Sequence, residues 1–92
     1  MQYPIKITPA AFRDIQQGIE YYTEKSNKPG QKFLSTVDAT VDKIAEYPLA
    51  ASFAYNQVRY KLVKGFPYVI FYRSTDTEVI ILRIFNTFLK PI

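Results

Sequence analysis

The chain has 92 residues and contains no Cys, no His and no Trp. Its length suits a single domain, and a hydrophobic content of 48% is enough to build one core. Without Cys and His, the chain has no disulfides, no thiolate metal sites, no Cys nucleophile and no imidazole base. We therefore expect no metal and no cofactor, and any catalysis must use the remaining polar side chains or the backbone.

The net charge of +4 is unevenly distributed along the chain. Residues 1–46 carry six Lys and Arg against six Asp and Glu, whereas residues 47–92 carry six against two. This asymmetry favours an acidic partner, either a nucleic acid or an acidic protein, for the C-terminal half. The alternative is ordinary surface charge that keeps the protein soluble.

The first predicted elements are a short strand and a helix. Residues 3–8 alternate apolar and polar side chains as a strand does, and Pro4 favours a position at the sheet edge. Thr8 and Pro9 form a good helix start, and the helix places Phe12, Ile15, Ile19 and Tyr22 on one face. Gly18 would allow a second helix to approach closely.

A turn over residues 26–30 leads to a second amphipathic helix, residues 31–46, which ends at Tyr47-Pro48. Its apolar stripe consists of Phe33 or Leu34, Val37, Val41 and Ile44. Because the connection between the helices is short, the two form an antiparallel hairpin.

After a mixed connection at residues 49–57, the pattern changes to strands at residues 58–63, 68–72 and 79–85. Lys64-Gly65 and residues 74–77 supply the turns. The order β-α-α-β-β-β predicts an α+β fold, a single domain over residues 1–92, with the helical hairpin packed on one face of a small antiparallel sheet. Alternation along residues 58–63 places Arg59 and Lys61 on the open face of that sheet, and Arg83 either reaches the same face or pairs with an acid of the helix layer.

One group of basic residues is the candidate for chemistry or for binding a nucleic acid or another acidic partner; it comprises Arg59, Lys61, Lys64, Arg73 and Arg83. In a nuclease without His, such groups would hold the scissile phosphate and stabilise its developing charge, with Arg59, Lys61 and Arg83 as the catalytic candidates. In a binding protein they would only contact an acidic surface. A third interpretation has Arg73 and Arg83 in ion pairs with Asp76 and Glu78.

An ordered set of motifs over nearly the whole chain resembles toxins of the RelE/ParE superfamily of type II toxin–antitoxin systems, also known as plasmid stabilisation proteins. The set comprises residues 5–10, Asp14-Ile15, residues 19–22, residues 30–34, residues 44–48, Val58-Arg59, residues 66–73 and residues 79–85. The resemblance implies a cognate antitoxin, and it implies either ribosome-dependent mRNA cleavage of the RelE type or poisoning of DNA gyrase of the ParE type.

The chain departs from the nuclease pattern of this superfamily at its C-terminal end. Many relatives carry a His, and then an Arg two residues later, after the last strand, where this chain has Asn86 and Phe88. Arg59 matches a basic residue that RelE-type enzymes use, but no Tyr follows Tyr72. These departures favour a ParE-like toxin over a nuclease, and an antitoxin-binding protein without toxicity is a further alternative.

The expected partners are a cognate antitoxin, bound in a groove between the helical hairpin and the sheet, and either DNA gyrase or the ribosome with its mRNA. Homodimers and toxin–antitoxin hetero-oligomers are both compatible with the sequence. Because no signal peptide or membrane-spanning run is visible, we expect a bacterial, cytoplasmic protein with no membrane partner.

Overall fold

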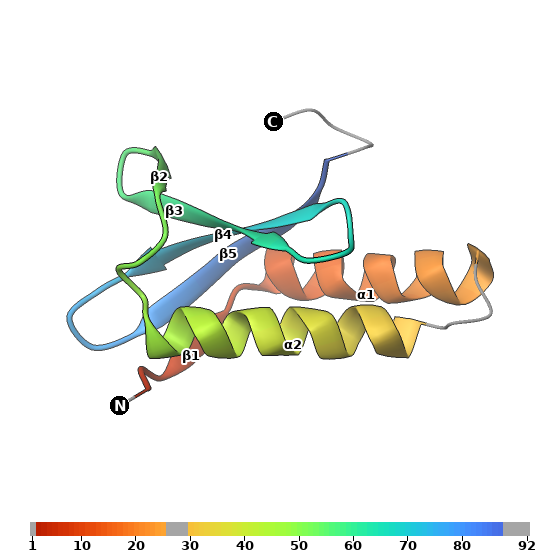
Figure 1. The fold of residues 1–92 in the computed structure, drawn as a ribbon, viewed down its shortest axis with the longest axis horizontal. Coiled ribbons are helices and arrows are strands. Elements are labelled where there is room, and N and C mark those ends of the chain that lie inside the picture. The colour runs from red at the N-terminus through yellow and green to blue at the C-terminus, as the bar shows by residue number, and fades with distance from the viewer. Residues whose placement is uncertain (1, 26–29, 88–92) are drawn as a thin grey trace.

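A computed structural model describes residues 2–25 and 30–87 of the chain. Two helices lie side by side on one face of a five-stranded sheet (Figure 1). The elements in chain order are β1 (Ile5–Ile7), α1 (Pro9–Lys25), α2 (Gly30–Glu46), β2 (Phe53–Tyr55), β3 (Val58–Val63), β4 (Tyr68–Ser74) and β5 (Val79–Asn86). The predicted α+β class is confirmed, with one additional short strand, β2, inside the segment expected to be a mixed connection.

The sheet has the order β1-β5-β4-β3-β2, so β4 is central, as its apolar character on both faces predicts. Strands β2 to β5 are joined by antiparallel pairs, whereas β1 pairs with β5 in parallel at the edge. β1 covers only Val79–Ile81 of β5, and α1 packs near the remainder of that strand. A cleft forms along this uncovered part of β5.

Helix α1 begins as the sequence predicts, because the Thr8 hydroxyl accepts a hydrogen bond from the Ala11 N–H at 3.1 Å. Ile15, Ile19 and Tyr22 pack against the core, but the expected inward position of Phe12 is wrong. Ala11 is fully buried there instead, and Phe12 is 54% exposed. The start of the helix is tied to the sheet by the Thr8 hydroxyl, which donates a hydrogen bond of 2.9 Å to the Leu82 carbonyl.

The helical hairpin depends on two glycines at the contact between the helices, Gly18 in α1 and Gly30 at the start of α2. A Cβ atom on Gly18 would overlap the ring of Phe33, and one on Gly30 would lie 2.5 Å from the Ile19 carbonyl oxygen. The expected close approach at Gly18 is therefore confirmed, and Phe33, not Leu34, is the buried member of the α2 stripe. The turn predicted for residues 26–30 lies outside the described residues except for Gly30, which begins α2.

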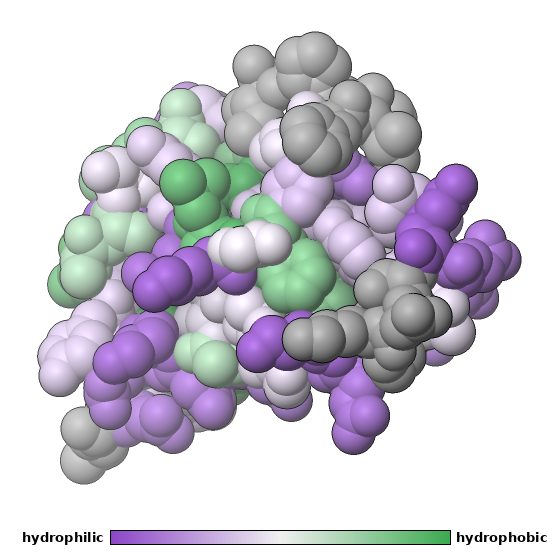
Figure 2. Space-filling view, turned by 45° about the vertical axis from the view of Figure 1, so that its right-hand side comes forward, coloured by the Kyte–Doolittle hydropathy of each residue, from purple (hydrophilic) through white to green (hydrophobic). Residues whose placement is uncertain are grey.

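The core lies between the helices and one face of the sheet. It joins the α2 stripe to residues on the helix-facing side of the three long strands, including Val63, Ile70, Tyr72, Ile81 and Ile84, and a register shift between β4 and β5 separates the last two by three positions. Figure 2 shows that hydrophobic side chains also reach the surface at the centre of one face, with hydrophilic side chains beside them. In the described residues, no helix is long and apolar enough to span a membrane.

The predicted orientation of β3 is wrong. Arg59, Lys61 and Val63 pair with Tyr72, Ile70 and Tyr68, which are core residues of β4, so this side of β3 faces the helices. Tyr60 and Leu62 lie on the open face instead, and Leu62 is 65% exposed. The pattern of the strand alone does not distinguish the faces because each contains a valine, and the long stems of Arg59 and Lys61 tolerate partial burial.

Candidate functional site

Arg59 is a structural residue in this fold. Its guanidinium donates hydrogen bonds to the backbone carbonyls of Leu49 and Ala51, in the connection between α2 and β2. The guanidinium carbon also lies 4.0 Å from the centroid of the Phe53 ring, a cation–π distance. With its donors directed at main-chain carbonyls, Arg59 holds the connection against β3.

Lys61 lines a small cleft of about 150 Å³ beneath the C-terminal end of α2. Lys43, Tyr47 and Tyr72 line the same cleft. The Tyr72 hydroxyl donates a buried hydrogen bond of 2.8 Å to the Pro48 carbonyl, and burial raises the pKa of this tyrosine, with the Arg59 charge opposing the increase. Arg59, Lys61 and Tyr72 therefore lie together beside the end of α2, on the helix-facing side of the sheet.

Arg73 and Lys64 are exposed and belong to other parts of the surface. Arg73 alternates with the core residue Tyr72, so it lies on the open face, and Lys64 lies in the turn between β3 and β4. The ion pairs proposed for Arg73 with Asp76 or Glu78 do not form. Glu78 instead pairs with Lys6 of β1 at 3.5 Å.

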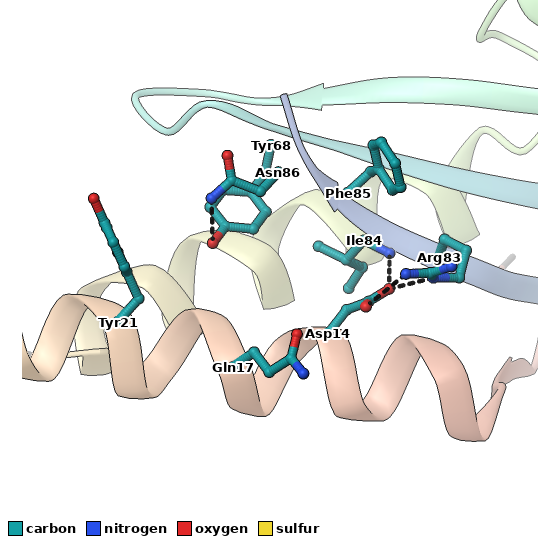
Figure 3. A pocket seen from close by; sticks show the side chains of 8 residues that line it. All are labelled: Asp14, Gln17, Tyr21, Tyr68, Arg83, Ile84, Phe85 and Asn86. Carbon is teal, nitrogen blue, oxygen red and sulfur yellow. Dashed lines mark hydrogen bonds and ion pairs between the residues drawn. The ribbon is translucent and has the colours of Figure 1, made fainter. Parts of the chain in front are cut away.

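Arg83 is held by Asp14 of α1, 69 residues away in the sequence. Its Nε and Nη2 donate to the two carboxylate oxygens at 2.7 and 3.0 Å, and the Ile84 N–H donates to the same carboxylate at 2.9 Å (Figure 3). These hydrogen bonds raise the pKa of Arg83 above its ordinary value. The pairing of Arg83 with an acid of the helix layer is confirmed, and its pairing across the β4–β5 turn is wrong.

A cleft of about 220 Å³ lies between α1 and the uncovered part of β5. Figure 3 shows Asp14, Gln17 and Tyr21 rising from α1 toward the end of β5. On the sheet side, the Asn86 amide donates to the Tyr68 hydroxyl at 3.1 Å. Burial raises the pKa of Tyr68, and the hydrogen bond from Asn86 offsets part of that increase.

The open face of the sheet is mainly aromatic and aliphatic. Tyr60, Leu62, Phe71 and Phe85 lie there, in alternation with core residues. The rings of Phe71 and Phe85 are 6.2 Å apart, and Tyr55 continues the row at 6.4 Å from Phe71. The guanidinium of Arg83 lies 5.6 Å from the Phe85 ring, at the border between this face and the cleft.

The five sequence-predicted cations therefore do not form one site. Arg59 and Lys61 lie on the helix-facing side, Arg73 lies on the open face, Lys64 lies in a turn, and Arg83 is paired at the far edge. Among the described residues, no group of three or more Asp and Glu is placed to hold a metal ion.

Sequence reasoning assigned no role to Asp14, which lines the cleft and fixes both Arg83 and the backbone of β5. No local signal distinguishes it from the other polar residues of α1, because its partners come from the opposite end of the chain. Asn86 was noted only as a departure from the superfamily pattern, and Tyr68 only as part of the predicted strand 68–72. Their contact across β4 and β5 depends on strand register.

Comparison with known proteins places this architecture among toxins. A family model described as the ParE toxin of the type II toxin–antitoxin system parDE matches residues 5–87. No curated protein matches the chain in sequence.

Several solved structures share the fold. A chain of the chromosomal ParDE toxin–antitoxin system from P. aeruginosa matches with a TM-score of 0.80 and 18% identity, over 92% of this chain and 96% of that chain. A chain of the RelBE2 toxin–antitoxin complex from Mycobacterium tuberculosis matches with a TM-score of 0.65 and 20% identity, over 94% and 99%. A chain of the DinJ-YafQ toxin–antitoxin complex from E. coli matches with a TM-score of 0.68 and 10% identity, over the full length of both chains.

Proposed function

This chain belongs to the ParE toxin family of type II toxin–antitoxin systems, and we propose that it is a toxin neutralised by a cognate antitoxin and directed against a protein target such as DNA gyrase. The alternatives are a ribosome-dependent mRNA endonuclease of the RelE type and an antitoxin-binding protein without toxicity.

The observation that carries the choice of a protein target is the separation of the basic residues. Phosphoryl chemistry without His needs several cations converging on one phosphate, within hydrogen-bond distance of its oxygens. Here the donors of Arg59 are directed at main-chain carbonyls, and those of Arg83 at Asp14. Arg73 lies on the opposite face of the sheet from Arg59 and Lys61, so the five predicted cations do not converge on one point, although Arg59 and Lys61 share a face.

The open face supports the same choice by its composition. Exposed aromatic and aliphatic side chains, such as Tyr60 and Leu62, gain most from contact with an apolar protein surface. A surface that binds the phosphate backbone of a nucleic acid is instead rich in Lys and Arg. We assign the contact with the target to this face.

We assign the antitoxin to the cleft between α1 and β5. Its lining combines apolar rings with the Asp14–Arg83 pair, a mixture suited to a peptide segment that buries side chains and forms a few polar contacts. The matched solved structures are of toxin–antitoxin complexes, which supports a partner of this kind.

The deciding experiment compares two activities of the purified protein. We expect it to inhibit supercoiling by DNA gyrase, with accumulation of cleaved DNA, and to leave translation of a reporter mRNA unchanged. The Lys61→Ala variant should keep the gyrase inhibition, because Lys61 faces the helices, whereas Leu62→Lys should lose it by placing a charge on the open face.

The opposite pattern would favour the nuclease. Cleavage of ribosome-bound mRNA that Lys61→Ala abolishes, together with normal supercoiling, would overturn the assignment. Growth without arrest on expression, together with tight binding of the antitoxin, would identify a protein without toxicity.

A further inference from the structure

The edge of the sheet at β2 lacks the charged side chains and prolines that usually protect an edge strand. Residues 47–58 contain no charged side chain. Natural sheet edges usually carry Lys, Pro within the strand, or an inward charge that prevents pairing with another chain. β2 carries none of these side chains, and all three of its residues are exposed; what protects it is its length of three residues and the register irregularity between Phe53 and Tyr55.

Four large side chains gather at this edge, and we call them the β2 edge patch: Tyr47, Leu49, Phe53 and Tyr55. Their exposed fractions range from 54% to 67%. Figure 1 shows the β2–β3 hairpin at the opposite end of the molecule from the C-terminal end of α1, and β2 lies at the opposite edge of the sheet from β1 and its neighbour β5. The patch is therefore separate from the cleft between α1 and β5.

The backbone of β2 is also oriented for pairing. The Tyr60 N–H donates to the Ser52 carbonyl at 3.1 Å, and Phe53 pairs with Arg59. Because the backbone groups of successive strand residues point in opposite directions, the N–H and carbonyl of Phe53 point away from β3. They form a donor and an acceptor side by side at an open edge.

The edge is held in this position by residues already described. Arg59 packs over the Phe53 ring and donates to the carbonyls of Leu49 and Ala51, so its donors are already engaged. Asn56, with a φ of 46°, lies in the two-residue turn that joins β2 to β3. The edge patch is thus a fixed surface of the fold.

We propose that the β2 edge binds a second copy of this chain, with the two β2 strands antiparallel and Phe53 near the twofold axis. In that arrangement the outward N–H and carbonyl of Phe53 exchange hydrogen bonds with the same groups of the other copy, as a twofold interface requires. The two sheets become one continuous sheet, and the two Phe53 rings lie opposite each other on one face.

Charge and area favour this occupant over an acidic protein. Residues 47–58 are neutral and Arg59 is already bonded, so an acidic segment finds no free cation within the edge itself, although Lys43 and Lys61 share a cleft with Tyr47 beside it. A large side chain has a surface of about 200 Å², and a little more than half of each of these four is exposed. Together they therefore offer roughly 500 Å² per copy, or about 1,000 Å² for the two copies of a dimer. That area is typical of a specific but weak dimer, and we expect dissociation in the micromolar range.

The test is sedimentation of the purified chain, free of antitoxin, from about 1 µM to about 1 mM and at several salt concentrations. We expect a mass that rises with concentration toward twice the 10.7 kDa of one chain. Because each copy carries a net charge of +4, added salt should strengthen this association, whereas it would weaken the binding of an acidic partner.

Two variants test the location of the contact. Phe53→Lys and Tyr55→Lys place a charge on opposite faces of the edge, and each should weaken the dimer at least about tenfold. Phe12→Lys is the matched control, since Phe12 on α1 is also 54% exposed, and it should leave the dimer unchanged. Circular dichroism checks that each variant is folded. Tyr55→Lys also keeps the contact between the Phe53 ring and Arg59, so a loss of dimer in this variant does not come from the loss of that contact.

Three results would overturn the proposal: a single-chain mass at every concentration, equal weakening by Phe12→Lys, or a monomer whose edge variants lose only antitoxin binding. The last result would assign the edge to the antitoxin. None of them bears on gyrase inhibition, which the Leu62→Lys and Lys61→Ala variants test separately.

Discussion

At the scale of single residues, Asp14 has the most connections to distant parts of the chain. One carboxylate, whose side chain is only 11% exposed, accepts two hydrogen bonds from Arg83 and one from the Ile84 backbone. The Arg83 side chain is 48% exposed, so the ion pair alone contributes at most about 1 kcal/mol. The bond to the part-buried Ile84 N–H is the larger contribution, because leaving that donor without a partner costs about 1–3 kcal/mol.

We therefore expect Asp14→Ala to lower the free energy of unfolding by about 2–3 kcal/mol. Asp14→Asn should cost less, because its amide oxygen still accepts from the Ile84 N–H. Urea denaturation measures both, with Asp38→Asn on the exposed face of α2 as the control. Equal stability of Asp14→Ala and the unchanged chain would show that water replaces Asp14 as the hydrogen-bond acceptor of the Ile84 N–H.

The basic residues show the limit of reading single positions. Arg59, Lys61 and Arg83 are all cations on strands, and the sequence treats them alike. In the fold, Arg59 stabilises a connection, Lys61 lines a small cleft, and Arg83 binds to α1. Their different roles follow from which face of the sheet each occupies and what lies opposite it.

At the scale of elements, the helical hairpin was predictable and the sheet only in part. The Thr8 cap, the stripe of α2 and the helix end at Pro48 depend on local sequence, and each is confirmed. β2 was not predicted because its three residues lie in a connection of mixed composition. It forms because β3 offers a free edge beside it, which is a tertiary condition.

The contact between α1 and α2 gives a prediction at this scale. Ala normally stabilises a helix relative to Gly by about 1 kcal/mol, but a Cβ atom at position 18 would overlap the buried Phe33 ring. We expect Gly18→Ala to destabilise the protein by about 1–3 kcal/mol, since Phe33 also packs against Tyr22, Phe66 and Tyr68 and has little room to move.

Thermal or urea unfolding measures this effect. Gln17→Ala, a neighbouring helix position on the exposed side, is the control and should change stability little. A Gly18→Ala variant more stable than the unchanged chain would mean that the hairpin tolerates wider spacing. In that case helix propensity would dominate over packing.

At the scale of the whole molecule, the buried tyrosines make the free energy of unfolding depend on pH in the alkaline range. Burial raises the pKa of Tyr22, Tyr68 and Tyr72 above the ordinary value of 10.0. A raised pKa in the folded state means that the fold favours the neutral hydroxyl. The resulting stability is fully present below the unfolded-state pKa and is lost as pH rises through the folded-state pKa.

We therefore expect the free energy of unfolding to fall as pH increases above about 10. Absorbance of tyrosinate should show a fraction of the eight tyrosines ionising only as the fold is lost. Tyr72→Phe removes one late-ionising group and the hydrogen bond to Pro48, so it should reduce the pH dependence while lowering stability near neutral pH. Simultaneous ionisation of all eight tyrosines in the folded protein would contradict this.

The sequence by itself determined the α+β class, the two helices with the Thr8 cap of the first, the three long strands and the resemblance to a toxin family. These features depend on composition and on hydrophobic patterns that repeat within a few residues. The absence of Cys and His likewise excluded whole classes of chemistry without any structure.

Only the tertiary structure decided which face of β3 meets the helices, that Asp14 binds Arg83, and that β2 presents an open edge. A strand with valines in both phases fits either face, and the packing of α2 selects one. Asp14 and Arg83 are 69 positions apart, and only the path of the chain brings them together. The candidate site depends on such long-range juxtapositions, which a local pattern does not contain.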